Sequence, residues 1–448
     1  MKSLTESEKR RVVRRVIRRL LALLMPMYVV TYIDRINIGF AQLDMGEHLG
    51  ITAAGYGVAA GLFFIGYCFF EIPSNMLAER FGSRQWLTRI LLTWGTLTVL
   101  TGFVADLFQL NVLRFLVGAA EAGFLPVIML YLRRWIPSRY MVKVMSWLFV
   151  TNPLAFLVGG LVGGLIIDHA DWFGLNPWQW VFIITGVPSV IFGFITWKLL
   201  PDAPRKVSWL STRETDWLES ELASEDAVEA EPGLKAQLAA LRHVRVLYLG
   251  LAFLTFAIGQ YGLNLFVPLI LRQFNPDYSA TNIGFAASIP YAVAAIALIV
   301  LPQWANASRR NFVTLACLPF FMVGGLIGVM RLQNEPLPAL IALTVAVTAS
   351  FTIIPLYWAM ASTSLNRTLA VVGVAMINSL ANLGGFIGPY LVGQDTSGEQ
   401  VTTGLIGPLL SCIVCGVLII LWPIVRRRTE QRSATAPLLT SSRQGELS

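Results

Sequence analysis

The sequence predicts an all-α integral membrane protein with twelve transmembrane helices in two six-helix halves. The chain is 55% hydrophobic and only 13% charged, whereas a soluble domain is about 25% charged. Its basic residues also cluster in every second connector between long apolar segments. That alternation is the pattern that the positive-inside rule leaves on a polytopic membrane protein.

Each predicted helix comes from a segment long enough to span a bilayer, which requires about 20 mostly apolar residues. The connectors that lack basic residues carry acidic ones instead, such as Asp106 and Asp168. An even number of spans and two basic tails place both tails in the cytoplasm. The predicted spans are 20–41, 55–78, 86–107, 110–132, 144–167, 179–200, 245–271, 283–304, 312–331, 337–360, 371–393 and 403–424.

One long break divides the chain into halves, and it begins with Pro201 and Pro204, which end the preceding helix. We interpret the break as a covalent, solvated bridge. Two six-helix halves joined in this way are typical of transporters that expose a midplane site to each side of the membrane in turn. The predicted domains are a basic cytoplasmic tail (1–19), the N-terminal half (20–200), a cytoplasmic linker (201–244), the C-terminal half (245–424) and a second cytoplasmic tail (425–448).

Several other classes of protein do not fit this sequence. The net charge of +8 does not indicate nucleic-acid binding, because the basic residues form no patch with stacking aromatics. The arginine-rich N-terminus is similar to a signal peptide but lacks a small-residue cleavage site, so we expect a retained first helix. All four cysteines lie in apolar segments, and we expect reduced packing residues: Cys68, Cys317, Cys412 and Cys415.

Charged residues inside the predicted spans are costly and require a reason. At about 1.5 Å per residue, Arg35 and Arg114 lie at one depth, and Glu121 lies about 10 Å deeper on the face of Arg114. Gly118, between the last two, is expected to leave open space. Asp34 and Arg35 point about 100° apart, so we expect Arg35 to face the cavity and Asp34 to meet a neighbouring helix.

These charges suit a carboxylate transporter, because an arginine offers a two-donor fork and a buried acid can carry a proton. The alternative is that the charges only pair with one another inside the bundle. We interpret Glu71, before Pro73, as structural. The C-terminal half offers polar groups at helical spacing, which either bind substrate or join helices: Tyr261, Asn264, Asn378 and Asn382.

The sequence around these positions resembles the major facilitator superfamily and, within it, the anion:cation symporter family. The matching motifs are Tyr32-Ile33-Asp34-Arg35-Ile36-Asn37-Ile38-Gly39-Phe40-Ala41, Phe63-Phe64-Ile65-Gly66-Tyr67, Leu113-Arg114-Phe115-Leu116-Val117-Gly118-Ala119-Ala120-Glu121 and Ile377-Asn378-Ser379-Leu380-Ala381-Asn382. The loop after the second span also keeps an acidic–basic motif, Glu79-Arg80-Phe81-Gly82-Ser83-Arg84, which is eroded at Asn306-Ala307-Ser308-Arg309-Arg310.

The resemblance implies the major facilitator fold and proton-driven uptake of an organic anion, such as a sugar acid, tartrate or an aromatic carboxylate. It implies a monomer in the inner membrane, with the proton as coupling ion and no cofactor. The implied roles are carboxylate binding by Arg35 beside Tyr32, Tyr67, Asn378 and Asn382, proton coupling by Asp34 and Glu121 with Arg114 tuning Glu121, and gating by Glu79, Arg80, Gly82 and Arg84.

Two alternatives remain open. A proton/drug antiporter of the same fold would need a carboxylate exposed to a cationic drug and no arginine in the cavity. A membrane enzyme or a transporter-like sensor is the other alternative. An enzyme would need a nucleophile–base pair or a metal site, and the three histidines all lie in connectors: His48, His169 and His243.

Overall fold

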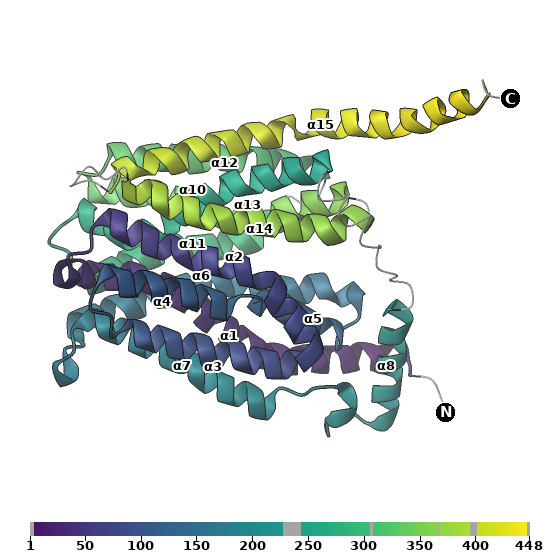
Figure 1. Cartoon of the computed structure of the whole chain (residues 1–448), viewed down its shortest axis with the longest axis horizontal. Helices are drawn as coiled ribbons and strands as arrows, with labels where there is room; N and C mark the ends of the chain where they lie inside the picture. Colours follow the sequence, from purple (N-terminus) through teal and green to yellow (C-terminus); the bar gives the residue numbers. More distant parts are fainter. Residues whose placement is uncertain (1–3, 227–242, 305–307, 366, 395–400, 446–448) are drawn as a thin grey trace.

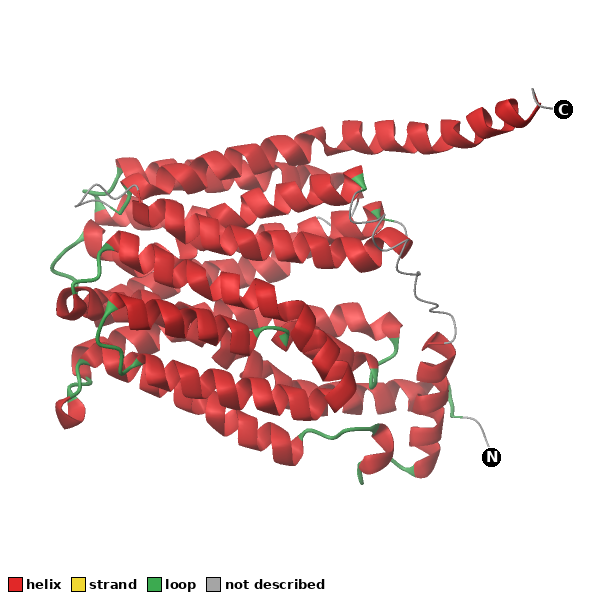
Figure 2. Cartoon of the chain, in the orientation of Figure 1, coloured by secondary structure: helices red, strands yellow, loops and turns green. Residues whose placement is uncertain are grey.

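The computed structural model describes residues 4–445 except 227–242, 305–307, 366 and 395–400. Within these residues the regular elements are helices, joined by short loops (Figure 2). The N-terminal half contains α1 (Glu6–Leu49), α2 (Ala53–Phe81), α3 (Ser83–Thr101), α4 (Leu107–Glu121), α5 (Phe124–Arg133), α6 (Ser138–His169) and α7 (Pro177–Leu199). The linker contributes α8 (Thr212–Asp226), and the C-terminal half contains α10 (Val244–Phe274), α11 (Ala280–Trp304), α12 (Ser308–Arg331), α13 (Pro336–Ser364), α14 (Arg367–Gln394) and α15 (Ile406–Gly445).

The predicted fold class is confirmed by these helices. In the described part of the chain, ten stretches are long and apolar enough to cross a membrane. Helices α3 and α14 occupy the two other predicted spans. Helix α1 contains the predicted span 20–41 and extends beyond it at both ends. Helix α1 begins at Glu6, where Thr5 and Glu8 form a capping box that satisfies the free amides of the first turn.

The fourth span is also not the single helix that we predicted for 110–132. Helix α4 ends at Glu121 and α5 begins at Phe124. Gly123, between them, has φ of 85°, a left-handed conformation that favours glycine. A Cβ atom there would also lie 2.8 Å from the Cβ of Ser74. The helix therefore breaks next to a buried carboxylate.

The two halves meet along two helix pairs, which we call the α2/α14 seam and the α6/α11 seam (Figure 1). Both seams are built on small residues that let the backbones approach closely. In the first, a Cβ on Gly57 would meet the carbonyl of Pro389. In the second, a Cβ on Gly284 would meet the carbonyl of Gly160. Neither seam could pack this way with larger side chains.

Residues 6–19, α8 and the end of α15 lie at one end of the bundle, which we call the tail face (Figure 1). Helix α8 docks on the N-terminal half, because Glu214 pairs with Arg15 at 3.3 Å and Glu221 pairs with Arg139 at 3.2 Å. The expected solvated bridge is thus in part a docked helix, and residues 227–242 of the linker lie outside the described residues.

At the opposite face the halves are held together by hydrogen bonds. Tyr56 Oη donates to the carbonyl of Leu265 at 2.6 Å. Asp168, at the end of α6, accepts from the backbone amides of Ala280 and Thr281 at 3.0 and 2.7 Å. A side chain of the N-terminal half therefore caps the first turn of α11 in the other half. This face of the bundle is closed.

Candidate functional site

The centre of the site is an ion pair between Arg35 on α1 and Glu121 on α4. Arg35 Nε donates to Glu121 Oε1 at 2.8 Å, and Arg35 Nη2 donates to the same oxygen. The Glu121 side chain is fully buried, and in the described part of the chain its second oxygen, Oε2, has no hydrogen-bond partner. Oε2 is therefore a buried carboxylate oxygen toward which no described donor points.

Aromatic rings surround the Arg35 guanidinium. Its Cζ lies 5.0 Å from the centroid of Tyr32, 5.3 Å from Phe63 and 5.3 Å from Tyr67. Such cation–π contacts hold a guanidinium in place while leaving its N–H groups available. Tyr32 and Tyr67 thus lie beside Arg35, as the sequence predicted. Tyr261 of the C-terminal half packs its ring 4.4 Å from that of Phe64, next to Phe63 in the same cluster.

Asp34 points away from this ion pair, toward α3, as expected from its helical angle. Its Oδ2 accepts from Trp94 Nε1 and, at 2.9 Å, from Thr98 Oγ1. Its Oδ1 accepts from Asn37 Nδ2 at 2.8 Å. Because three donors compensate the buried carboxylate, Asp34 is part of a polar network inside the N-terminal half.

Arg114 is buried, and Glu121, seven residues later on the same helix, pairs with Arg35 instead. The Cζ of Arg114 lies 5.2 Å from the Phe63 ring, and within the described residues its Nε has no hydrogen-bond partner. One ring of Phe63 therefore contacts both arginines. The predicted open space at Gly118 was wrong, because a Cβ there would meet the Phe63 carbonyl. Helix α2 fills that space.

The end of α4 has a further residue that the sequence analysis missed. Arg89 of α3 donates from Nη1 to the carbonyl of Ala120 at 3.2 Å, and its Cζ lies 4.5 Å from the Trp86 ring. The broken helix leaves such carbonyls without helical partners. The Gly123–Pro126 pair after Glu121 could have indicated a break at this position.

The amides of α14 bind Glu71 of α2. Asn378 Nδ2 donates to Glu71 Oε1 at 2.9 Å, and Asn382 Nδ2 donates to Glu71 Oε2 at 3.2 Å. Our interpretation of Glu71 as merely structural is therefore incomplete, because Glu71 joins the two halves. The two asparagines predicted to bind substrate are engaged with Glu71 in this conformation.

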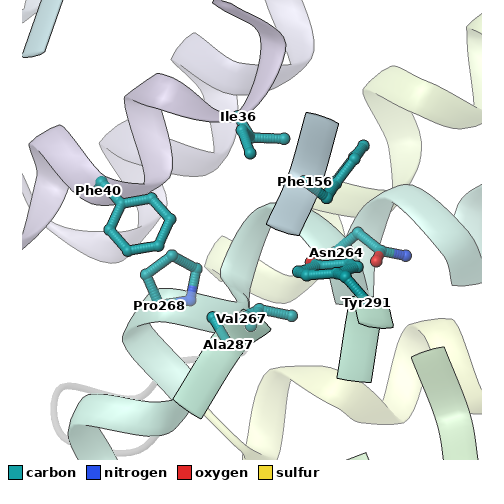
Figure 3. Close-up of a pocket in the computed structure, with 8 residues that line it drawn as sticks. All are labelled: Ile36, Phe40, Phe156, Asn264, Val267, Pro268, Ala287 and Tyr291. Carbon is teal, nitrogen blue, oxygen red and sulfur yellow. The ribbon is translucent and has the colours of Figure 1, made fainter. Parts of the chain in front are cut away.

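Asn264 hydrogen-bonds within the C-terminal half. It donates to the carbonyl of Gln260 at 2.8 Å and to Ser350 Oγ at 3.3 Å. Figure 3 shows it beside Tyr291 at a small enclosed cavity with mostly apolar walls. Asn264 therefore joins helices of the C-terminal half, which is the packing alternative that the sequence left open.

The gating motif lies at the turn between α2 and α3. Gly82 has φ of 89° and ends α2. Arg84 Nε pairs with Asp202 Oδ1 of the linker at 2.9 Å, whereas Glu79 and Arg80 are exposed. In this conformation the motif is anchored to the start of the linker. Among the described residues, no cluster of His, Cys, Asp and Glu could hold a metal ion.

These features define a class of protein. Two helical halves meet at a closed face and enclose an arginine–carboxylate pair in the membrane interior, which is the arrangement of a secondary transporter. Residues 24–389 match the family model described as Major Facilitator Superfamily. The chain belongs to this superfamily and is a multi-pass membrane transporter, so the superfamily predicted from the motifs is confirmed.

Relatives with transporter names agree with this assignment. The chain is 36% identical to the "Quinolone resistance transporter" of Acinetobacter baumannii, covering 91% of this chain and 94% of the relative. It is 36% identical to a "Putative tartrate transporter" of Agrobacterium vitis, over 87% and 89% of the two chains. The "Inner membrane transport protein RhmT" of Escherichia coli is 31% identical, over 90% and 93%.

Solved structures show the same fold. A bacterial homolog of the human lysosomal transporter Spinster, titled as inward-facing and unoccupied, matches with a TM-score of 0.70 at 17% identity, covering 91% of this chain and 95% of that chain. The xylose transporter XylE of E. coli, titled as partially occluded inward open, matches with a TM-score of 0.69 at 14% identity, over 92% and 98%.

Proposed function

We propose that this protein takes up an organic carboxylate anion together with protons, by alternating access. The observation that carries the proposal is the buried Arg35–Glu121 pair. A guanidinium binds a carboxylate through two parallel hydrogen bonds, and Glu121 holds that guanidinium through a group that can be protonated. Substrate and proton therefore act on the same arginine.

The geometry supports a competition mechanism. While Glu121 is ionised, it occupies Arg35 and opposes the entry of a second anion. A proton on Oε2 removes the negative charge and weakens the ion pair, so that Arg35 is free to bind the substrate carboxylate. When the proton leaves, Glu121 takes Arg35 back and displaces the anion. Anion and proton are thereby bound and released together, and they cross in the same direction.

The surrounding residues have supporting roles in this proposal. The rings of Tyr32 and Tyr67 hold the guanidinium and offer faces on which an aromatic acid can stack. Tyr261 completes the site from the C-terminal half. Arg114 acts electrostatically on Glu121 through space. Asp34 is the second proposed proton-coupling group, acting through its network with α3.

We further propose that the tail face is cytoplasmic and that the protein lies in the inner membrane as a monomer. Three exposed arginines lie in the tail-face end of α1, namely Arg10, Arg14 and Arg18. The positive-inside rule places such residues in the cytoplasm. The face closed by Tyr56 and Asp168 is then the outer one. In this orientation the closed side faces the source of substrate and protons.

One specific observation favours the drug-antiport alternative, namely the relative named for quinolone resistance. Export of a cation in exchange for protons needs a carboxylate that the drug can reach. Glu121 is fully buried and already bound to Arg35, so a cation would meet a competing positive charge. Symport of an anion therefore fits the site better.

The test is transport by the purified protein. Ligands are first found by thermal shift against a panel of organic acids, because a bound ligand stabilises the folded state by mass action. Uptake into proteoliposomes is then measured with an acidic exterior. Accumulation driven by the proton gradient and abolished by a protonophore is expected. Accumulation driven by a sodium gradient alone would refute proton coupling, and proton-driven drug efflux without carboxylate uptake would refute symport.

A further inference from the structure

Glu71 makes a side-chain contact between the two halves inside the bundle. Its two oxygens accept one hydrogen bond each from Asn378 and Asn382, at 2.9 and 3.2 Å. Glu71 is 7% exposed and Asn382 is 9% exposed. The asparagines lie one turn apart on α14, so both amides reach the same carboxylate.

The chemistry of this contact is directional. An ionised carboxylate only accepts hydrogen bonds, so each amide must turn its NH₂ group toward Glu71. A buried carboxylate left without such donors is strongly destabilising. While Glu71 is ionised, the orientation of both amides is thus fixed by α2 rather than by a substrate.

The contact also lies at a defined place in the α2/α14 seam. Glu71 is eighteen residues beyond the start of α2 at Ala53, or about 27 Å along the helix. Between these two positions the seam is apolar and closely packed, for example where Gly61 faces Phe386. Pro73 follows two residues after Glu71 and removes the hydrogen bond to the carbonyl of residue 69, so α2 can bend in the turn that contains Glu71.

The contact is close to the Arg35 site as well. Tyr67 lies one turn before Glu71 on α2, and its ring is 5.3 Å from the Arg35 guanidinium. Arg35 and Glu71 interact electrostatically. Any shift of α14 relative to Glu71 therefore moves the wall of the C-terminal half relative to Arg35.

We propose that Glu71, Asn378 and Asn382 form a clasp that sets the position of α14 against the N-terminal half, with Glu71 as the positioning residue. The role of this clasp in transport rests on the proposed function. The clasp assigns both asparagines to Glu71 in the conformation seen here, and it makes their side chains part of the interface between the halves.

The test exchanges donor and acceptor across the seam. Asn382→Asp alone places two carboxylates face to face, whereas Glu71→Gln alone leaves a neutral contact with one mismatched donor pair. In the double variant, the new glutamine donates to the new aspartate and accepts from Asn378. All three variants preserve side-chain size, so they differ in hydrogen bonding and charge alone.

Two readouts are compared, namely carboxylate uptake in proteoliposomes and hydrogen exchange of residues 64–76 and 373–382 in lipid nanodiscs. We expect Asn382→Asp to reduce uptake at least about tenfold, because facing buried carboxylates repel each other. It should also accelerate exchange at both segments. Adding Glu71→Gln should restore both readouts to within about threefold of wild type, since a charged donor–acceptor pair is regained.

The clasp is refuted if Asn382→Asp has the same effect with and without Glu71→Gln. Misfolding of the single variant with recovery in the double variant supports the clasp. If both variants misfold, the comparison is repeated with Asn378→Asp, with and without Glu71→Gln. The clasp is then refuted if Glu71→Gln does not change the effect of Asn378→Asp. Hydrogen exchange needs no substrate, so failure to find carboxylate uptake would overturn the proposed function while leaving the clasp tested.

Discussion

The two halves share a helical architecture but differ in the polar groups that they bring to the membrane interior. The N-terminal half carries charged residues into the interior, where they form the Arg35–Glu121 pair, the Asp34 network and one side of the clasp, with Arg114 against the Phe63 ring. The C-terminal half contributes neutral polar groups, namely the hydroxyl of Tyr261 and the amides of Asn378 and Asn382.

This difference indicates which transport function each half performs. Charged groups respond strongly to a proton or an anion, whereas neutral amides and hydroxyls respond weakly. The N-terminal half is therefore suited to binding and coupling, and the C-terminal half to closing around the site. Two carboxylates of the N-terminal half accept hydrogen bonds from the C-terminal half, namely Glu71 in the interior and Asp168 on the closed face.

The largest expected effect comes from comparing a substitution in the N-terminal half with a matched one in the C-terminal half. Arg35→Lys keeps the charge but loses the planar fork. Loss of a hydrogen bond to a charged group lowers binding by roughly 10- to 100-fold, and uptake at low substrate concentration should fall accordingly. The matched change in the other half, Tyr261→Phe, should lower uptake by less than about fivefold. Equal effects in initial-rate assays would contradict the division between the halves.

A second experiment separates binding from coupling within the N-terminal half. Glu121→Gln imitates the protonated acid and cannot release a proton, so it should still exchange substrate across the membrane but fail to accumulate it up a proton gradient. Counterflow and proton-driven uptake, assayed on the same proteoliposomes, measure the two activities. If both activities are lost together, Glu121 binds substrate or maintains structure, and coupling would depend on Asp34.

A third prediction concerns the seam that joins the halves. In Gly57→Ala the new methyl group would collide with the Pro389 carbonyl, and overpacking of this kind costs about 1–3 kcal/mol. The melting temperature in detergent should fall. Gly324→Ala is the matched control, because a Cβ at Gly324 meets nothing within 4 Å. Alanine has the better helix propensity, so Gly324→Ala should be neutral or stabilising. A similar loss of stability in both variants would mean that the contact with Pro389 is not responsible.

The smallest expected effect is at the closed face. Asp168→Ala removes the side chain that caps α11, and loss of a cap costs about 1 kcal/mol. Hydrogen exchange of residues 280–284 should therefore accelerate about fivefold, with little change in substrate affinity. Asp168→Asn should give an intermediate effect, since asparagine keeps one acceptor oxygen for the two backbone amides that Asp168 binds. Unchanged exchange in the alanine variant would show that Tyr56 and the seams close this face without Asp168.

The sequence by itself determined the spans, the two halves and the residues that carry charge into the membrane. These are local properties, because about 20 apolar residues suffice to specify a spanning helix and basic connectors specify its direction. The helical angle between Asp34 and Arg35 was also enough to predict that they face different neighbours.

The tertiary structure alone decided which partner each charge takes. Glu121 pairs with Arg35, 86 residues away, and not with Arg114, seven residues away on its own helix. Glu71 binds amides more than 300 residues later in the chain. Such pairings depend on the rotation and depth of each helix against its neighbours. These are set by the packing of residues such as Gly118 and by the break at Gly123, and no local pattern contains them.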